Sequence, residues 1–225
     1  MSNIVHLSAF QAPETGPEVL GMAGFSDVFP SSAEDAGSTA FLLTSLRHVT
    51  KPILWVRDRM SGKEAGEMYL AQRLPSGVLH VSLNRPVDVL QAMEDGLHSG
   101  AIGAVVGEMW GEPKALSFTA TKRLALRAET SGVPCCLLRH AAQPNLSAAR
   151  NRWRIRSLPS ARHPYDPGAP GAPRWEVELF RSRTARPGAW VAEYDSAQDR
   201  LHFAARTADG ALADTGRARR QPAPA

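Results

Sequence analysis

Glu108 is the carboxylate whose place in the sequence best fits a ligand site, because it follows the apolar run from Ala101 to Val106. This run contains one isoleucine and two valines and lies between Gly100 and Gly107, so it predicts a short, buried parallel strand. In open α/β sheets, the residues just past the carboxyl end of such a strand face the ligand crevice. A nucleotide-binding ATPase would hold magnesium with a carboxylate at that point, so Glu108 raises the question of a phosphate site.

The segment that can be compared with a phosphate-binding loop is residues 32–39. A P-loop needs Gly, four residues and then Gly-Lys-Ser/Thr, because backbone amides and the lysine charge cradle the phosphates while the hydroxyl reaches magnesium. Gly37 and Thr39 agree with this pattern, whereas Ser32 stands in place of the first Gly and Ser38 in place of the Lys. The segment is therefore a degenerate loop, and no cofactor is predicted.

Other kinds of catalytic site have little support in the sequence. Cys135 and Cys136 are adjacent in the apolar run VPCCLL and are expected to pack as small hydrophobic residues, with a redox role as the alternative. The seven histidines lack the close paired spacing of a zinc site, so no metal is predicted. No apolar run approaches the ~20 residues of a membrane span, and the N-terminus lacks a signal-peptide pattern. We therefore expect a cytoplasmic protein with no membrane partner.

An alternation of helices and strands is predicted to position these residues. Ser31 and Ser32 followed by acidic residues favour a helix start, Pro86 suits the first turn of another helix, and Gly132 favours a helix end. The repeated order of helix and strand implies an α/β fold with a mainly parallel sheet flanked by helices. The expected helices cover residues 31–48, 63–74, 86–100 and 117–132, and the expected strands cover residues 53–56, 78–83, 101–106 and 133–138.

The pattern changes after Arg139, where three alternating segments predict antiparallel strands separated by turns. These segments are residues 175–180, 189–194 and 201–205. We therefore expect an irregular lead-in at residues 1–30, one domain at 31–206 with an αβ core at 31–139 and an antiparallel extension at 150–206, and a disordered basic tail at 207–225.

The positive charge is concentrated in the C-terminal part. The formal net charge is +4, but residues 1–136 carry −3 and residues 137–225 carry +7. On a strand, the alternation from residue 150 to 156 places four arginines on one face, where they could contact DNA phosphates non-specifically. The alternative is a solvent face whose arginines pair with acidic neighbours such as Glu176 and Glu178. The four DNA-binding candidates are Arg150, Arg152, Arg154 and Arg156.

Several aromatic and basic residues are candidates for partner binding. Trp110 follows Gly107 in an expected loop near the ligand edge of the sheet, whereas core packing is favoured for Phe118. The C-terminal strands can present an unpaired edge with aromatic residues of the kinds found in interfaces, although the tryptophans there could instead close the core. A basic tail could steer an acidic partner. These C-terminal candidates are Trp175, Trp190, Tyr194, Arg217, Arg219 and Arg220.

Three segments in a fixed order resemble the ImuA family. They read VLQAMEDGLHSGAIGAVVGE, TATKRLALRAETSGVP and RWEVELFRSRTARPGAWVAEYD, and the similarity runs from about Gly24 to Ala205. The stretch from Leu79 to Glu108 also looks like the second half of the bacterial RecA ATPase core.

The resemblance implies a RecA-like fold and a non-catalytic adaptor of the SOS response to DNA damage. ImuA proteins are accessory factors encoded with ImuB, a Y-family-like protein, and an error-prone polymerase, and they take part in translesion synthesis and mutagenesis. The implied partner is ImuB, with RecA, the polymerase and non-specific single-stranded DNA as further candidates. A SulA-like inhibitor that binds the tubulin-like division protein is the alternative in another functional class.

The RecA resemblance also assigns positions to the acidic residues. Glu108 falls where the Walker B aspartate would be, and Asp58 lies near the place of the catalytic glutamate of RecA. Glu34 and Asp35 put two negative charges where phosphates would lie, which opposes triphosphate binding. We therefore expect fold remnants and no ATPase, while a weak ATPase stays the enzymatic alternative.

Overall fold

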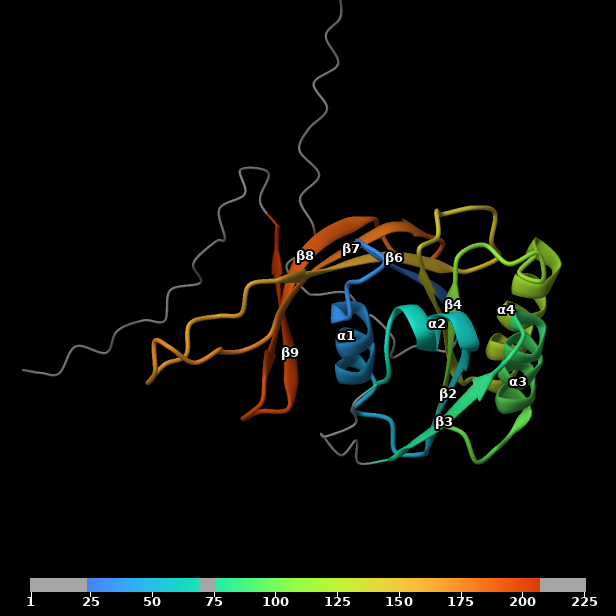
Figure 1. Ribbon diagram of the computed structural model, residues 1–225, viewed down its shortest axis with the longest axis horizontal. Coiled ribbons are helices and arrows are strands. Elements are labelled where there is room, and N and C mark those ends of the chain that lie inside the picture. Colours follow the sequence, from blue (N-terminus) through green and yellow to red (C-terminus); the bar gives the residue numbers. More distant parts are fainter. Residues whose placement is uncertain (1–23, 69–75, 207–225) are drawn as a thin grey trace, which may run out of the picture.

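A computed structural model of the chain describes residues 24–68 and 76–206 and contains one nine-stranded sheet (Figure 1). The strand order is β3-β2-β4-β5-β1-β6-β7-β8-β9. The strands are β1 (Gly24–Pro30), β2 (Ile53–Asp58), β3 (Val78–Leu83), β4 (Ala104–Trp110), β5 (Pro134–His140), β6 (Asn151–Leu158), β7 (Arg174–Ser182), β8 (Gly188–Asp195) and β9 (Arg200–Ala205). The helices are α1 (Gly37–Ser45), α2 (Arg59–Glu64), α3 (Pro86–His98) and α4 (Phe118–Ser131).

The first six strands in this order, β3, β2, β4, β5, β1 and β6, pair in parallel, and the strands β6, β7, β8 and β9 pair antiparallel. Helices α3 and α4 pack against each other and cover one face of the parallel part, where Met93, Leu124 and Leu137 belong to one buried cluster. Helix α1 covers the other face. The prediction of an α/β fold with a mainly parallel sheet and an antiparallel extension is confirmed.

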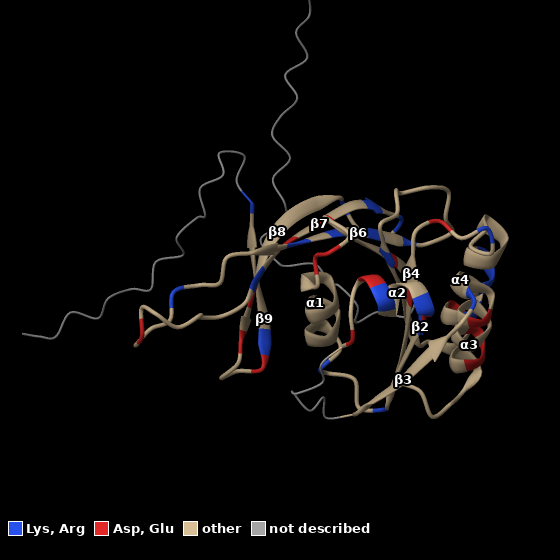
Figure 2. Cartoon of the chain, viewed as in Figure 1, with Lys and Arg blue, Asp and Glu red and all other residues tan. Residues whose placement is uncertain are grey.

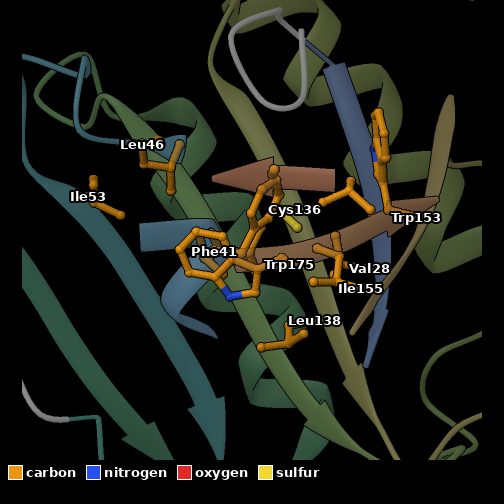
Figure 3. Close-up of a cluster of buried hydrophobic side chains, with 14 of the residues drawn as sticks. Val28, Phe41, Leu46, Ile53, Cys136, Leu138, Trp153, Ile155 and Trp175 are labelled. Atoms are coloured by element: carbon orange, nitrogen blue, oxygen red, sulfur yellow. The ribbon is translucent and has the colours of Figure 1, made fainter. Parts of the chain in front are cut away.

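The antiparallel strands contribute to the hydrophobic cluster that also buries α1 (Figure 3). Phe41 of α1 lies with its ring centroid 5.6 Å from that of Trp175 of β7, in an edge-to-face arrangement that aromatic pairs favour. Trp153 and Ile155 of β6 belong to the same cluster. The extension is therefore part of the core of the domain.

The two long helices begin and end where the sequence predicts. Ser117 accepts a hydrogen bond from the amide of Ala120 at 3.2 Å, as an N-cap residue does, and Gly132 ends α4 with a φ of +70°. Pro86 occupies the first turn of α3. These signals are local, so the sequence alone sufficed to place them.

The lead-in predicted at residues 1–30 is wrong for its last part, because residues 24–30 form β1 in the middle of the sheet. The sequence GFSDVFP conceals this strand, since Ser26 and Asp27 interrupt its apolar run although both are buried. Residues 1–23 and the tail predicted from 207 lie outside the described residues.

The other differences concern element boundaries. Helix α1 starts at Gly37 and not near Ser31, and α2 covers residues 59–64 where a helix was predicted at 63–74, of which 69–74 are not described. Strand β4 is shifted towards the C-terminus by several residues. Gly107 lies inside β4 and does not end the strand. A β-carbon at this position would overlap Met93 of α3, so the glycine reflects close packing between β4 and α3.

None of the described helices has the length and apolar character needed to cross a membrane.

Candidate functional site

The carboxyl ends of the parallel strands form one edge of the sheet, which we call the carboxyl edge. The connections from β2 to α2, from β3 to α3 and from β4 to α4 all leave the sheet there, as does the loop from β1 to α1. Ligands of open α/β proteins bind at this edge. The structure brings most of the residues predicted to do chemistry to this edge.

Glu108 lies within β4 and is 4% exposed, so the prediction that it follows the strand is corrected. Its Oε2 accepts a hydrogen bond from Trp55 Nε1 at 2.8 Å, and its Oε1 lies 3.0 Å from His140 Nε2. Burial raises the pKa of Glu108, but the hydrogen bonds from His140 and Trp55 outweigh it and hold the pKa below its ordinary value. The carboxylate is thus held by two side chains of the core.

Trp110 is the last residue of β4 and lies over this buried pair. Its ring stacks on His140 with the ring centroids 6.0 Å apart and an angle of 19° between the planes. Its backbone amide donates to Asp58 Oδ2 at 3.3 Å. Trp110 was predicted in a loop, but it is a half-buried strand residue that shields the Glu108–His140 pair from solvent.

Asp58 has a structural role at the end of β2. Its Oδ1 accepts a hydrogen bond from the amide of Ser61 at 2.7 Å, so Asp58 is the N-cap of α2. The side chain is 2% exposed. With the second oxygen directed at the Trp110 amide, both carboxylate oxygens are engaged by backbone donors.

The degenerate loop between β1 and α1 holds a carboxylate of its own. Asp35 accepts hydrogen bonds from the amide of Gly37 at 2.9 Å, from the amide of Ser157 at 2.9 Å and from the Ser157 hydroxyl. Gly37 is needed because a β-carbon there would overlap the Ser157 side chain. Burial raises the pKa of Asp35, but these hydrogen bonds prevail and lower it. The first amide of α1 is therefore occupied by an internal anion.

The rest of the loop offers no phosphate contacts of the P-loop type. Ser38, which stands in place of the P-loop lysine, is fully buried, and Thr39 is half-buried in the first turn of α1. Ser32 and Glu34 are exposed. Among the described residues, no group of three His, Cys, Asp or Glu could hold a metal ion.

The four DNA-binding candidates at positions 150, 152, 154 and 156, which we call the ridge arginines, lie in β6 and just before it and are paired with acidic residues. Arg150 contacts Glu129 at 2.7 Å and Arg154 contacts Glu178 at 2.6 Å, while Arg156 pairs with Glu176. Arg152 is buried and its Nε lies 3.4 Å from Asp27 Oδ2. The alternative weighed from the sequence, that these arginines pair with acidic neighbours, agrees with the contacts at Glu176 and Glu178.

Asp27 is a buried charged residue that sequence reasoning missed because it lay in the predicted lead-in. It is fully buried between Arg139 of β5 and Arg152 of β6, and both guanidinium groups also lie over the ring of Phe29. Burial raises the pKa of Asp27, although hydrogen bonding from Ser147 and the charges of the two arginines act against this. A single Asp inside an apolar heptapeptide was the only signal for this cluster.

The aromatic residues expected to bind a partner through the C-terminal strands lie in the core. Trp175 is 4% exposed, Trp190 is 1% exposed and Tyr194 is 8% exposed. The Tyr194 hydroxyl donates to Asp199 Oδ1 at 2.6 Å. These three residues are corrected to core residues, because the antiparallel strands close the hydrophobic layer over α1. Arg217, Arg219 and Arg220 lie outside the described residues.

Large apolar side chains are instead exposed around the carboxyl edge. Met60 and Val87 are 45% and 49% exposed at the starts of α2 and α3, and Phe118 is 42% exposed at the start of α4. Leu146, 70% exposed, lies in the connection from β5 to β6. We call Met60, Val87, Phe118 and Leu146 the apolar edge set. The prediction of core packing for Phe118 is thus wrong, and no pattern in the sequence predicts the set as a group.

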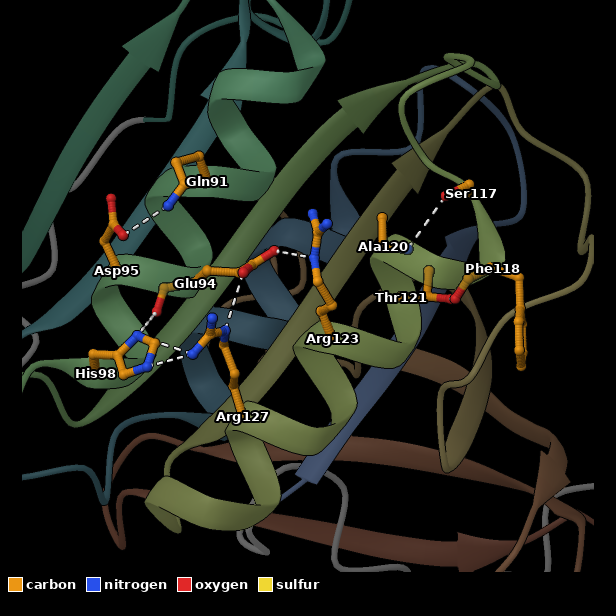
Figure 4. Close-up of polar contacts among 10 residues, drawn as sticks. All are labelled: Gln91, Glu94, Asp95, His98, Ser117, Phe118, Ala120, Thr121, Arg123 and Arg127. Atoms are coloured by element: carbon orange, nitrogen blue, oxygen red, sulfur yellow. Dashed lines mark hydrogen bonds and ion pairs between the residues drawn. The ribbon is translucent and has the colours of Figure 1, made fainter.

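The position of Phe118 is fixed by the pairing of α4 with α3 (Figure 4). Glu94 of α3 is 4% exposed and contacts Arg123 Nε at 2.9 Å and Arg127 Nε at 3.0 Å. Figure 4 shows Phe118 at the opposite end of α4 from Arg127, pointing away from this contact. The amide of Ala148 donates to Thr121 Oγ1 at 3.1 Å and ties the connection that carries Leu146 to the first turn of α4.

Fold and site together define an α/β protein with a mostly parallel sheet, in which the carboxylates of the carboxyl edge are engaged by the chain itself. No family model matches the chain. It is 31% identical over 196 residues to Protein ImuA of Caulobacter vibrioides strain NA1000, with 79% of this chain and 78% of that protein covered. Protein ImuA of strain ATCC 19089 gives the same values. The chain belongs to the ImuA family.

The contacts of Glu108 predict a structural role. Glu108→Ala should lower the free energy of unfolding by about 1–3 kcal/mol for each buried donor left without a partner, at Trp55 and at His140. Glu108→Gln keeps an oxygen for Trp55 and should lose less. Urea denaturation of both variants measures this. An alanine variant as stable as the parent would contradict the structural role.

The lowered pKa of Asp35 predicts a dependence of stability on pH. A carboxyl group whose pKa is lowered by folding stabilises the protein above its unfolded pKa, and this stabilisation is lost as the pH falls through the folded pKa. The parent should therefore lose more unfolding free energy than Asp35→Asn between about pH 7 and about pH 3. Urea denaturation at both pH values provides the test, and equal losses in the two proteins would refute it.

Proposed function

We propose that this chain is a non-catalytic adaptor of the ImuA–ImuB mutagenesis system and that it binds ImuB. The observation that carries the proposal is the engagement of Asp35, which occupies donors at the start of α1 where a nucleotide phosphate would sit. Membership of the ImuA family links such a protein to the SOS response and to translesion synthesis by an error-prone polymerase. The adaptor acts in the cytoplasm, with RecA as a further candidate partner.

The RecA-like character of the fold is part of this proposal. A strand, a loop and a helix start in succession at the carboxyl edge, as in P-loop proteins, and β1 lies among parallel strands. The loop has lost the lysine and the first glycine of that motif. The P-loop-like arrangement and the missing lysine and glycine are both explained by descent from a nucleotide site in which the Asp35 carboxylate now takes the place of the phosphate. The fold then serves as a scaffold for partner binding.

The surface proposed to bind ImuB is the carboxyl edge, with Phe118 and Leu146 at its centre. Interfaces need apolar side chains that become buried on binding, and the apolar edge set supplies four such side chains on separate, rigidly anchored elements. Trp110 lies at the same edge and is half-buried. The C-terminal strands lack such a surface because their tryptophans are already in the core.

The absence of nucleotide binding can be measured directly. Isothermal titration of the protein with ATP and magnesium should show no binding at micromolar concentrations, because a triphosphate would have to displace the Asp35 carboxylate from its donors. Micromolar affinity that is lost in Thr39→Ala would overturn this part of the proposal.

The proposed interface predicts that Phe118→Ser combined with Leu146→Ser weakens ImuB binding at least about tenfold, because two exposed apolar anchors are lost. Both side chains are exposed, so the thermal unfolding midpoint should change little. Leu126→Ser is the matched control, since Leu126 is 54% exposed on the same helix. Co-purification with ImuB and surface plasmon resonance measure the effect.

Two outcomes would contradict this interface. In the first, the double variant and the Leu126 control bind ImuB equally well. In the second, a chain truncated after residue 207 loses ImuB binding while the double variant keeps it, which would assign the contact to the basic tail.

A further inference from the structure

The end of β7 and the turn into β8 carry three exposed arginines, which we call the hairpin arginines: Arg181, Arg183 and Arg186. None of the three forms an ion pair with any described residue, in contrast to the paired arginines of β6. Arginines that are not engaged in ion pairs create a positive potential that attracts anions. The hairpin therefore carries a local excess of positive charge.

A bulge in β7 explains why Arg181 and Arg183 lie on the face of the sheet opposite α1. Trp153 pairs with Leu179, but Arg152 pairs with Arg181, so Phe180 is an extra residue in β7. Before the bulge, the odd-numbered residues Val177 and Leu179 point into the core around α1. Beyond the bulge, the alternation is reversed, and Arg181 lies on the same face as its partner Arg152.

The pairing continues in the same sense beyond the strand. The amide of Arg183 donates to the carbonyl oxygen of Arg150 at 3.0 Å, which places these two residues opposite each other. Residues two apart on a strand share a face, so Arg181 and Arg183 stand together beside the ridge arginines. Glu129 is an acidic residue near this end, and its carboxylate is already bound to Arg150 at 2.7 Å. This hydrogen bond and the charges of Arg150 and Arg183 lower the pKa of Glu129.

Hydrogen bonds of Ser182 anchor the loop that carries Arg183 and Arg186. The Ser182 hydroxyl accepts hydrogen bonds from the amides of Thr184 at 3.0 Å and Ala185 at 2.9 Å, and it donates to Asn151 Oδ1 at 2.6 Å. Arg183 and Arg186 are thus presented on a loop anchored to β6. Fixed side-chain origins reduce the entropy lost when the arginines engage a ligand.

We infer that the hairpin arginines form a binding site for the phosphate backbone of nucleic acid. Phosphate groups require positive charge and hydrogen-bond donors but no apolar contact. The aromatic ring of Phe180, at the bulge, is covered by Arg152 and Arg154, whose guanidinium carbons lie 5.5 Å and 5.1 Å from its centroid. Without an exposed aromatic or apolar centre, the site suits neither a specific protein interface nor stacking on bases, so binding is independent of sequence.

Figure 2 shows basic residues along β6 and at the neighbouring end of β7. Because β7 runs antiparallel to β6 and Ser182 pairs with Asn151, the hairpin lies at the amino ends of the parallel strands. The apolar edge set lies at the opposite edge. The site is therefore separate from the proposed ImuB surface, and the two can be tested apart.

The test compares the salt dependence of binding to a fluorescein-labelled oligothymidine and to a duplex of the same length. Replacing the three hairpin arginines with glutamine should lower the slope of log affinity against log salt by about 2 for the single strand, since each phosphate contact contributes about 0.7. The thermal unfolding midpoint should be unchanged because all three side chains are exposed. If the slope falls for one of the two DNA forms and not for the other, the form for which it falls is the ligand.

Two control variants locate the effect. Replacing Arg59, Lys114 and Lys122 with Gln removes the same charge from exposed residues at the carboxyl edge and should leave the slope close to that of the parent. Replacing Arg154 and Arg156 with Gln removes arginines that are already neutralised and should change the slope by less than half as much.

The inference is overturned if the parent binds neither DNA form, or if the hairpin variant keeps the parent slope. It is also overturned if either control lowers the slope as much as the hairpin variant does. Loss of ImuB binding by the hairpin variant with DNA binding intact would assign the arginines to the protein interface instead, whereas failure of the ImuB proposal leaves the DNA result unaffected.

Discussion

The burial of Asp27 in the middle of the sheet is the constraint on which the rest of the structure depends. A carboxylate buried in β1 must be compensated, and the compensation comes from arginines on both neighbouring strands, Arg139 of β5 and Arg152 of β6. Asp27 and Arg152 are opposite each other in the β1–β6 register. Their pairing joins the parallel half of the sheet to the strand that begins the antiparallel half, and it fixes which residues of β6 face inward.

The same principle governs the carboxyl edge. Asp35, Asp58 and Glu108 occupy positions where an α/β enzyme would hold a ligand or a metal, and each carboxylate accepts hydrogen bonds from the chain itself. A substrate would have to replace these internal contacts. The edge is thus suited to contact through its exposed apolar side chains, and the proposed adaptor function follows from the internal hydrogen bonds of these three carboxylates.

How well the sequence predicted the structure depended on how local the determinants were. Helix α4 was placed correctly because Ser117 and Gly132 act within a turn of its ends. Strand β1 was missed because the burial of Asp27 is made possible by Arg139 and Arg152, which lie more than a hundred residues further along the chain. The family could be identified from the sequence because the resemblance consists of three segments in a fixed order and therefore rests on many positions.

The candidate sites were harder to predict, because exposure is a property of the folded surface. Trp175 and Trp190 are of a residue type that is common in interfaces, yet they fill the layer between α1 and the antiparallel strands. The four ridge arginines alternate as expected, but their partners come from three other elements, including Glu129 of α4 and Glu178 of β7. The bulge at Phe180 leaves no sequence signature, and it places Arg181 and Arg183 on the same face as Arg152 and Arg150. The result is a molecule with an apolar surface at one edge of its sheet and a basic surface at the other. Such a separation lets a protein and a nucleic acid bind at the same time without competing for one surface, which suits the proposed adaptor function.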